Sequence, residues 1–152
     1  MLLDQLSTFA EEVSLVGATG TAKIGTALDI VNPRNIGWGS SANLEIRVGK
    51  TAVDSAADGA TLGFQVVTAD NEALTTNVVV LQTIAAIPQA SLEAGALIHV
   101  GQVPLNSEAK RWIGLRSVRG GEAITAGTLN AHFTVTPRGW YGHTAATGAS
   151  AQ

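Results

Sequence analysis

Three side chains able to ligate a cation or act as acids, Asp70-Asn71-Glu72, follow an alternating apolar pattern at residues 61–69. A calcium loop supplies several oxygen ligands and has a central glycine and a late glutamate. Residues 70–81, DNEALTTNVVVL, contain neither that glycine nor that glutamate. Asp and Asn side chains also hydrogen-bond to their own backbone in turns. We therefore interpret the cluster as the turn that ends a strand.

Two glycine-containing stretches match nucleotide-binding loops only in part. Residues 17–20, GATG, lack the third glycine of a dinucleotide-binding turn, because Lys23 occupies that position, and a strand-like pattern follows where a helix is required. Residues 49–51, GKT, end like a phosphate-binding loop, but Leu44 stands where that loop needs its first glycine. We interpret the first stretch as a glycine-rich hairpin and reject the second match.

The remaining reactive side chains do not form a catalytic pattern. His99, His132 and His143 are scattered, and the chain has no cysteine, no nucleophile elbow and no HExxH helix. The sequence therefore predicts no catalytic residue, no metal and no cofactor, and so a protein that is not an enzyme. A β-sandwich hydrolase that uses Asp70 or Glu72 is a distant alternative.

Composition describes a charge-poor chain of one-domain length. Of its 152 residues, 45% are apolar and 14% are charged, and the net charge is −3. A surface with so little charge indicates that a partner covers much of it. Residues 101–152 hold five basic and two acidic side chains, but the overall charge argues against nucleic acid as the partner. No signal peptide or membrane span is predicted.

The elements that would position these residues are short strands. Several segments alternate apolar and polar residues with the period of two that marks half-buried strands, while 77–84 is apolar on both faces and reads as a central or covered strand. Helical turns are expected only at 4–12 and 89–94. The predicted strands are 13–17, 24–31, 43–48, 61–69, 77–84, 97–103, 111–118 and 128–136.

Turn residues separate these segments at short intervals, which favours an all-β fold. The sequence predicts a single-domain antiparallel β-sandwich of jelly-roll type with about eight strands. We expect an N-terminal arm at 1–12, the sandwich at 13–136, and a C-terminal tail at 137–152 that is flexible unless docked.

An ordered set of segments resembles a known family. The segments are MLLDQLSTFAEEVSL, ALDIVNPRNIGWGSSANLEIRV, GATLGFQVVTADNEALT, AKRWIGLRSV and TAGTLNAHFTV, and together they span about residues 1–136. They resemble the capsid cement (decoration) proteins of short-tailed and related bacteriophages, in the branch with a jelly-roll fold. The most specific block is 59–74, and the tail at 137–152 has no counterpart.

The resemblance implies a structural protein of the virion, made in the host bacterial cytoplasm and bound to the outer surface of the capsid. Its partner would be the phage major capsid protein, whose neighbouring subunits it would clamp after shell expansion. It would act as a homo-oligomer, a dimer or trimer on local symmetry axes. No nucleic acid and no membrane are expected as partners.

We predict that the contact surface combines a basic strand with the two ends of the chain. A carbohydrate-binding β-sandwich module is the alternative function, with Trp38, Trp112 or Trp140 as the stacking platform. The predicted capsid or oligomer contacts are Leu2, Leu3, Phe9, Arg111, Trp112, Arg116, Arg119, Trp140 and Tyr141.

Overall fold

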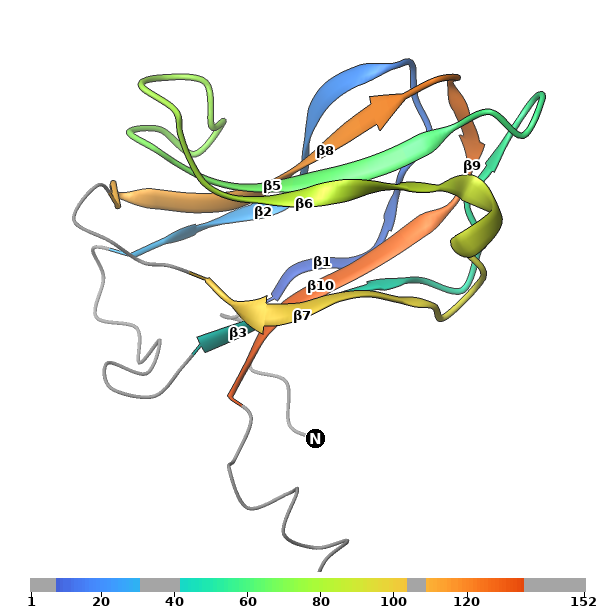
Figure 1. The fold of residues 1–152 in the computed structure, drawn as a ribbon. Coiled ribbons are helices and arrows are strands. Elements are labelled where there is room, and N and C mark those ends of the chain that lie inside the picture. Colours follow the sequence, from blue (N-terminus) through green and yellow to red (C-terminus); the bar gives the residue numbers. More distant parts are fainter. Residues whose placement is uncertain (1–7, 31–41, 104–108, 136–152) are drawn as a thin grey trace, which may run out of the picture.

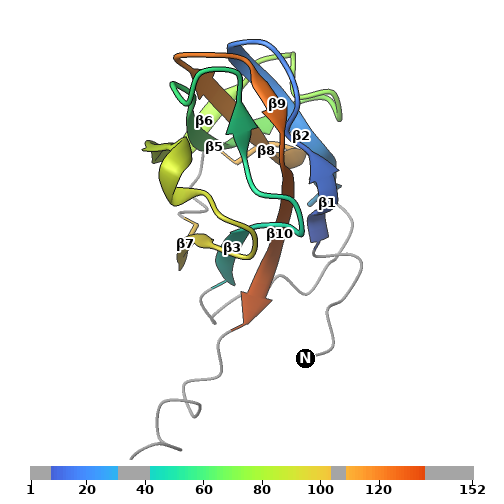
Figure 2. The same cartoon turned by 90° about the vertical axis from the view of Figure 1, so that its right-hand side faces the viewer.

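A computed structural model describes residues 8–30, 42–103 and 109–135, and these form a β-sandwich (Figure 1). Its elements are β1 (Thr8–Ser14), β2 (Gly20–Asp29), β3 (Ala42–Val48), β4 (Asp54–Ser55), β5 (Thr61–Ala69), β6 (Val79–Pro88), the 3-10 turn η2 (Gln89–Ser91), β7 (Leu97–Gln102), β8 (Trp112–Gly120), β9 (Ile124–Ala126) and β10 (Thr128–Val135). One sheet has the strand order β1-β10-β3-β7, the other β2-β8-β5-β6, and β4 pairs with β9. Figure 2 shows the two layers from the side.

The strand pairing is that of a long hairpin rolled into two sheets. Strand β1 pairs with β10, β2 with β8, β3 with β7 and β5 with β6, all antiparallel. These pairs are nested along the chain, with the β5–β6 connection innermost. Two four-stranded sheets joined in this way make a jelly roll. The predicted jelly-roll sandwich is confirmed: the described residues form eight strands in two sheets and two short strands beside them.

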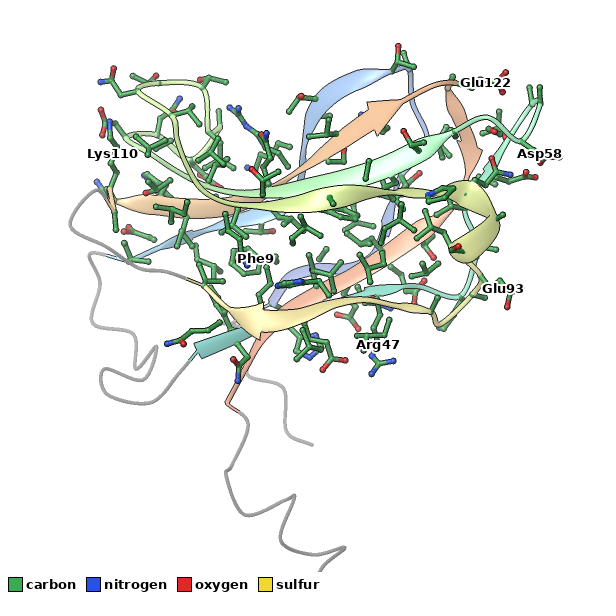
Figure 3. The ribbon with its side chains drawn as sticks, in the orientation of Figure 1. Phe9, Arg47, Asp58, Glu93, Lys110 and Glu122 are labelled. Carbon is green, nitrogen blue, oxygen red and sulfur yellow. The ribbon has the colours of Figure 1, made fainter. Side chains whose placement is uncertain are left out.

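The core lies between the sheets and uses the faces that alternation predicts. Phe9 contacts Phe133 edge-on, with ring centroids 4.8 Å apart and an interplanar angle of 63°. Figure 3 shows Phe9 pointing into the space between the layers. The buried residues that were predicted to face inward are Leu44, Ile46 and Val48 on β3, Leu62, Phe64 and Val66 on β5, and Leu129, Ala131 and Phe133 on β10.

The start of the chain differs from the prediction. The helical turn expected at 4–12 is wrong over its described part, because residues 8–12 belong to strand β1. The arm boundary at residue 12 therefore falls inside a strand. Burial of Phe9 and Ala10 in the core accounts for this, since a strand places these side chains against β10. The hairpin expected at 17–20 is also wrong, because this segment crosses from one sheet to the other.

Strands β1 and β2 close one side of the sandwich. They approach so closely that a Cβ atom on Gly25 would lie 1.8 Å from the carbonyl oxygen of Phe9. Gly25 has a φ of 60°, a conformation that glycine adopts at little cost. At the other side, β6 is an edge strand, so of the two predicted alternatives, a central or a covered strand, the central one is wrong. Val80 of β6 pairs with Val67 of β5, which belongs to a second, smaller apolar cluster.

Candidate functional site

The loop between β5 and β6, residues 70–78, contains the Asp70-Asn71-Glu72 cluster and the last residues of the block 59–74. It rises above the sheet β2-β8-β5-β6 on the face away from the core (Figure 1). Beneath it lies a small cluster of buried apolar residues, separate from the main core: Ala27, Val67, Ala69 and Leu74, with Val78 and Trp112 packed against them. The loop is therefore held on the sheet by its own hydrophobic contacts.

Leu74 anchors the loop on the sheet. Its side chain is completely buried, although the residues around it in the loop are polar. It lies over Gly114 of β8, where a Cβ atom would come within 2.4 Å of Leu74 Cδ1. Gly114 thus leaves the space that Leu74 fills. Leu74 also has a φ of 57°, an unfavourable value for a branched side chain, which its burial must offset.

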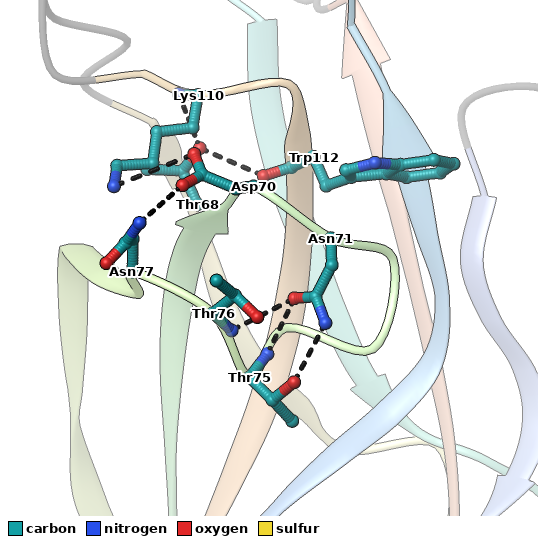
Figure 4. Close-up of polar contacts among 8 residues, drawn as sticks. All are labelled: Thr68, Asp70, Asn71, Thr75, Thr76, Asn77, Lys110 and Trp112. Atoms are coloured by element: carbon teal, nitrogen blue, oxygen red, sulfur yellow. Dashed lines mark hydrogen bonds and ion pairs between the residues drawn. The ribbon is translucent and has the colours of Figure 1, made fainter.

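Asn71 fixes the backbone of the loop (Figure 4). Its Oδ1 accepts hydrogen bonds from the backbone N–H groups of Thr75, at 2.9 Å, and Thr76, at 3.0 Å. Its Nδ2 donates to the Thr75 hydroxyl at 2.8 Å. These are the side-chain to backbone bonds that Asn makes in turns. The interpretation of Asp70-Asn71-Glu72 as a turn is confirmed for Asn71.

Asp70 has a different role from the one expected, because its carboxylate contacts side chains. Oδ2 accepts a hydrogen bond from Asn77 Nδ2 at 2.7 Å, and Oδ1 lies 3.7 Å from Lys110 Nζ. The backbone N–H of Lys110 donates to the Thr68 hydroxyl, and that hydroxyl donates to the carbonyl oxygen of Trp112. Figure 4 shows this chain of contacts linking both ends of the loop to the start of β8.

Two further cations bind the loop backbone from the sheet below. Lys23 Nζ on β2 donates to the carbonyl oxygen of Glu72 at 2.9 Å. Arg116 Nη2 on β8 donates to the carbonyl oxygen of Leu74. Lys23 and Arg116 are cross-strand partners, so they face the same side of the sheet. Hydrogen bonds from charged donors are stronger than neutral ones, so the pair helps to fix the loop.

Arg111 and Asp29 form an ion pair beside the loop. Arg111 Nη2 lies 2.9 Å from Asp29 Oδ2, and Arg111 Nε also contacts both carboxylate oxygens. The Asp29 side chain is buried, while Arg111 is exposed. The hydrogen bond to Asp29, together with its negative charge, raises the pKa of Arg111. The Arg111 guanidinium also lies 5.4 Å from the ring centroid of Trp112, which occupies one face of that ring.

The structure brings together only part of the predicted contact set. Arg111, Trp112 and Arg116 lie beside the 70–78 loop, as described above. Arg119 lies near the other end of β8, where Nη1 donates to the carbonyl oxygen of Leu15 at 3.3 Å. Phe9 is a core residue, so in the folded chain its side chain is not available for a surface contact. Leu2, Leu3, Trp38, Trp140 and Tyr141 lie outside the described residues.

The basic strand is consequently not a stripe of free positive charge. Each of its arginines and Lys23 donates to an acceptor within the chain, and Lys110 forms an ion pair with Asp70. Sequence reasoning missed the residues that receive or support these contacts, above all Leu74, Gly114 and Asp29. Two features of the sequence could have indicated Leu74 and Gly114. Leu74 is the one large apolar residue in the polar run 70–77, and a glycine inside a strand often marks a close approach.

Three titratable side chains away from the loop have shifted pKa values. Glu12 accepts hydrogen bonds from the Lys50 backbone N–H, the Asn130 side chain and the Thr128 hydroxyl, and these lower its pKa to about 2. Desolvation lowers the pKa of His99 and of His132. The contacts of Glu12 join β1 to β10 and to the end of β3. This carboxylate therefore serves the fold.

The described residues give no sign of a metal centre. None of them form a group of three or more His, Asp or Glu side chains placed to hold an ion. Within the same part of the chain, no helix is long and apolar enough to cross a membrane.

The fold and the loop define a jelly-roll protein in which one projecting loop is fixed on the outer face of a sheet. A family model described as Bbp16 matches residues 14–133, which is most of the chain, and the chain therefore belongs to the Bbp16 family. No curated protein matches the chain.

Proposed function

We propose that this chain is a structural virion protein that binds the outer surface of a phage capsid, clamps neighbouring major capsid protein subunits and stabilises the expanded head. The observation that carries the proposal is the 70–78 loop. Residues 70–74 of the loop belong to the block 59–74 that most resembles capsid cement proteins, and contacts of Leu74, Asn71, Lys23 and Arg116 hold the loop on the sheet.

The exposed part of this loop is suited to a protein contact that depends on shape complementarity. The side chains of Glu72, Ala73, Thr75 and Thr76 are small or polar and remain accessible or partly so. A loop that is already ordered loses little conformational entropy when a partner docks on it. We therefore assign the loop tip, with Arg111 and Trp112 beside it, as the surface that meets the capsid.

A clamp of this kind stabilises the shell by mass action, because it binds the assembled form and not separated subunits. Many copies on one shell, each contacting more than one subunit, would add avidity to a modest single contact. We include a symmetric homo-oligomer in the proposal, since two or more linked copies hold several subunits at once.

The first experiment measures co-sedimentation of the purified chain with expanded capsids stripped of it, with unexpanded shells as the control. We expect saturable binding to expanded shells alone. The absence of binding to either kind of shell would refute the proposed function. Because the nearby cations have internal partners, we expect binding through this surface to weaken little as salt concentration rises.

A matched pair of variants tests the loop itself. Thr76→Arg places a large cation on the loop tip, and Thr19→Arg makes the same change at an exposed position between β1 and β2. We expect Thr76→Arg to weaken shell binding at least about tenfold, which corresponds to about 1.4 kcal/mol. Thr19→Arg should bind like the unmodified chain. Equal affinities for the two variants would remove the loop from the contact surface.

A further inference from the structure

Arg111 is an exposed side chain that the fold holds in one position. The side chain is 56% exposed, yet Asp29 accepts hydrogen bonds from Arg111 Nε at 3.2 and 3.3 Å and from Nη2 at 2.9 Å. The guanidinium also lies 5.4 Å from the ring centroid of Trp112. An exposed arginine ordinarily samples many rotamers, whereas these contacts fix where the guanidinium lies and how its plane is oriented.

The backbone on each side of Arg111 is fixed as well. The buried Thr68 hydroxyl accepts a hydrogen bond from the Lys110 N–H at 2.7 Å and donates one to the Trp112 carbonyl oxygen at 2.9 Å (Figure 4). The carbonyl oxygen of Arg111 itself accepts a hydrogen bond from the Ile30 N–H at 2.9 Å. The point from which the arginine side chain extends therefore has little freedom.

Stability alone does not account for a carboxylate at position 29. The Asp29 side chain is only 8% exposed. Removing a carboxylate from water is costly, and an ion pair with a largely exposed arginine returns little free energy. A neutral side chain at this position would avoid that cost. The buried carboxylate is explained if its role is to hold Arg111.

The Arg111 guanidinium keeps hydrogen-bond donors for a partner. A guanidinium carries five N–H groups in a planar fork. Asp29 lies along the edge that Nε and Nη2 form, and no described residue accepts a hydrogen bond from Nη1. The end of the fork, which consists of Nη1 and the second N–H of Nη2, is therefore available to an acceptor outside the chain.

The charges around Arg111 indicate which acceptor fits. The two cations just before β8 each have a carboxylate partner: Asp29 pairs with Arg111, and Asp70 pairs with Lys110. These pairs leave no net positive charge that would favour a carboxylate over a neutral group. A neutral carbonyl oxygen still gains from a charged donor, because such hydrogen bonds are stronger than those between neutral groups. A backbone carbonyl oxygen of a protein partner is therefore the acceptor that we expect.

We infer that Arg111 is the recognition residue of the proposed capsid contact: its guanidinium, positioned by Asp29, donates to a backbone carbonyl oxygen of the major capsid protein. The inference rests on the proposed function and goes further, because it specifies one donor, its positioning residue and the class of acceptor. Arginine and tryptophan are the residues that most often dominate the binding energy of an interface. Because Arg111 is held before the partner arrives, docking costs it little rotamer entropy.

Binding to expanded shells tests the donor. Arg111→Lys keeps the charge and removes the planar fork. Arg47→Lys is the matched control, because Arg47 is also an exposed arginine paired with a carboxylate, on the other sheet. We expect at least about tenfold weaker binding for Arg111→Lys and unchanged binding for Arg47→Lys. If the unmodified chain binds and Arg111→Lys binds equally well, the inference is overturned and the proposed function stands; if the unmodified chain does not bind, both are overturned.

The salt dependence of the same binding tests the class of acceptor. The double variant Asp29→Asn/Arg111→Gln removes both charges, so no unpaired carboxylate is left buried. With a neutral acceptor, its affinity and that of the unmodified chain should fall by the same factor between about 50 and about 300 mM salt. A clearly smaller fall for the double variant would mean that Arg111 meets a carboxylate, and would overturn the assignment of a carbonyl oxygen.

The positioning role of Asp29 is tested by a double-mutant cycle. Asp29→Asn keeps the size of the side chain and removes its charge. It should weaken shell binding at least about fivefold in the unmodified background and less than about twofold in the Arg111→Lys background, because Asp29 acts through the guanidinium. Equal fold-changes in the two backgrounds would overturn the positioning role.

Nuclear magnetic resonance of the free chain tests the same point without shells. The Nε–H order parameter of Arg111 should be close to that of rigid backbone, about 0.85, and should fall below about 0.6 in Asp29→Asn. A value below about 0.6 in the unmodified chain would overturn the inference that the fold holds this arginine ready for a partner.

Discussion

The packing of Leu74 over Gly114 predicts a measurable coupling between these two positions. Gly114→Ala adds a Cβ atom where Leu74 Cδ1 already lies, at a separation of 2.4 Å. Because Leu74 is fully buried, its side chain cannot move aside without uncovering the cluster beneath the loop. The same substitution should be harmless once Leu74 has been shortened to alanine.

The expected free energies follow from these contacts. Leu74→Ala should lower the free energy of unfolding by about 2–3 kcal/mol, near the lower end for a buried leucine because the cluster is small. Gly114→Ala alone should cost about 1–2 kcal/mol, since overpacking outweighs the reduced entropy of the unfolded chain. In the Leu74→Ala background, Gly114→Ala should instead stabilise by about 0.5 kcal/mol. The coupling energy is therefore roughly 2 kcal/mol.

Urea unfolding of the unmodified chain, the two single variants and the double variant, at one protein concentration, measures this coupling. Leu74→Ala should also lower the melting temperature by roughly 5–10 °C. Gly63→Ala is a useful comparison on neighbouring β5, where an added Cβ atom would contact backbone atoms of β6 and not Leu74. Additive effects of Leu74→Ala and Gly114→Ala would refute the role of Leu74 as the residue that anchors the loop.

Three further predictions concern charged and titratable side chains. The pKa of Glu12 is lowered to about 2. Its stabilising effect is therefore complete above its ordinary pKa of 4.5 and is lost as the pH falls toward 2. Glu12→Gln should reduce the loss of stability between about pH 5 and pH 3. Burial lowers the pKa of His99 and His132, so just below pH 6.5 the unfolded chain binds more protons than the folded chain does. The melting temperature should therefore rise with pH in that range, and His132→Gln should make this rise smaller. Arg111→Ala leaves the buried Asp29 carboxylate without its arginine and should lower the melting temperature more than Arg47→Ala, because the carboxylate partner of Arg47, Glu45, is less buried than Asp29. Equal effects would contradict this.

Much of the fold could be predicted because strands with one buried face have a period of two. Residues 43–48, 61–69 and 128–136 show that alternation and match β3, β5 and β10 closely. The same rule failed at residues 8–12, where the buried and exposed side chains of β1 do not alternate regularly. Its two register shifts against β10 explain that irregularity. The apolar run at 77–84 left open whether that strand is central or covered, and β6 lies at an edge of its sheet.

The site was harder to predict because its contacts join residues distant in sequence. Asp29 and Arg111 are 82 residues apart, and Arg116 donates to a carbonyl group 42 residues away. A local pattern can identify a basic strand or a turn, but it does not reveal that cations of the strand bind the turn. That pairing depends on the nested strand order, which places the β5–β6 loop above β8 and β2. Only the turn chemistry of Asn71 was readable from neighbouring residues alone.

The distribution of cations over the two faces of β8 bears directly on what the strand can bind. Arg116 faces the outer side and holds the loop, whereas Arg119, three positions further along, points to the opposite side, because strand residues an odd number apart face opposite ways. A basic run along one strand therefore cannot act as one basic surface. What the sheet offers to a partner is the loop that its cations hold, and the shape of that loop, more than its charge, would determine which partner fits.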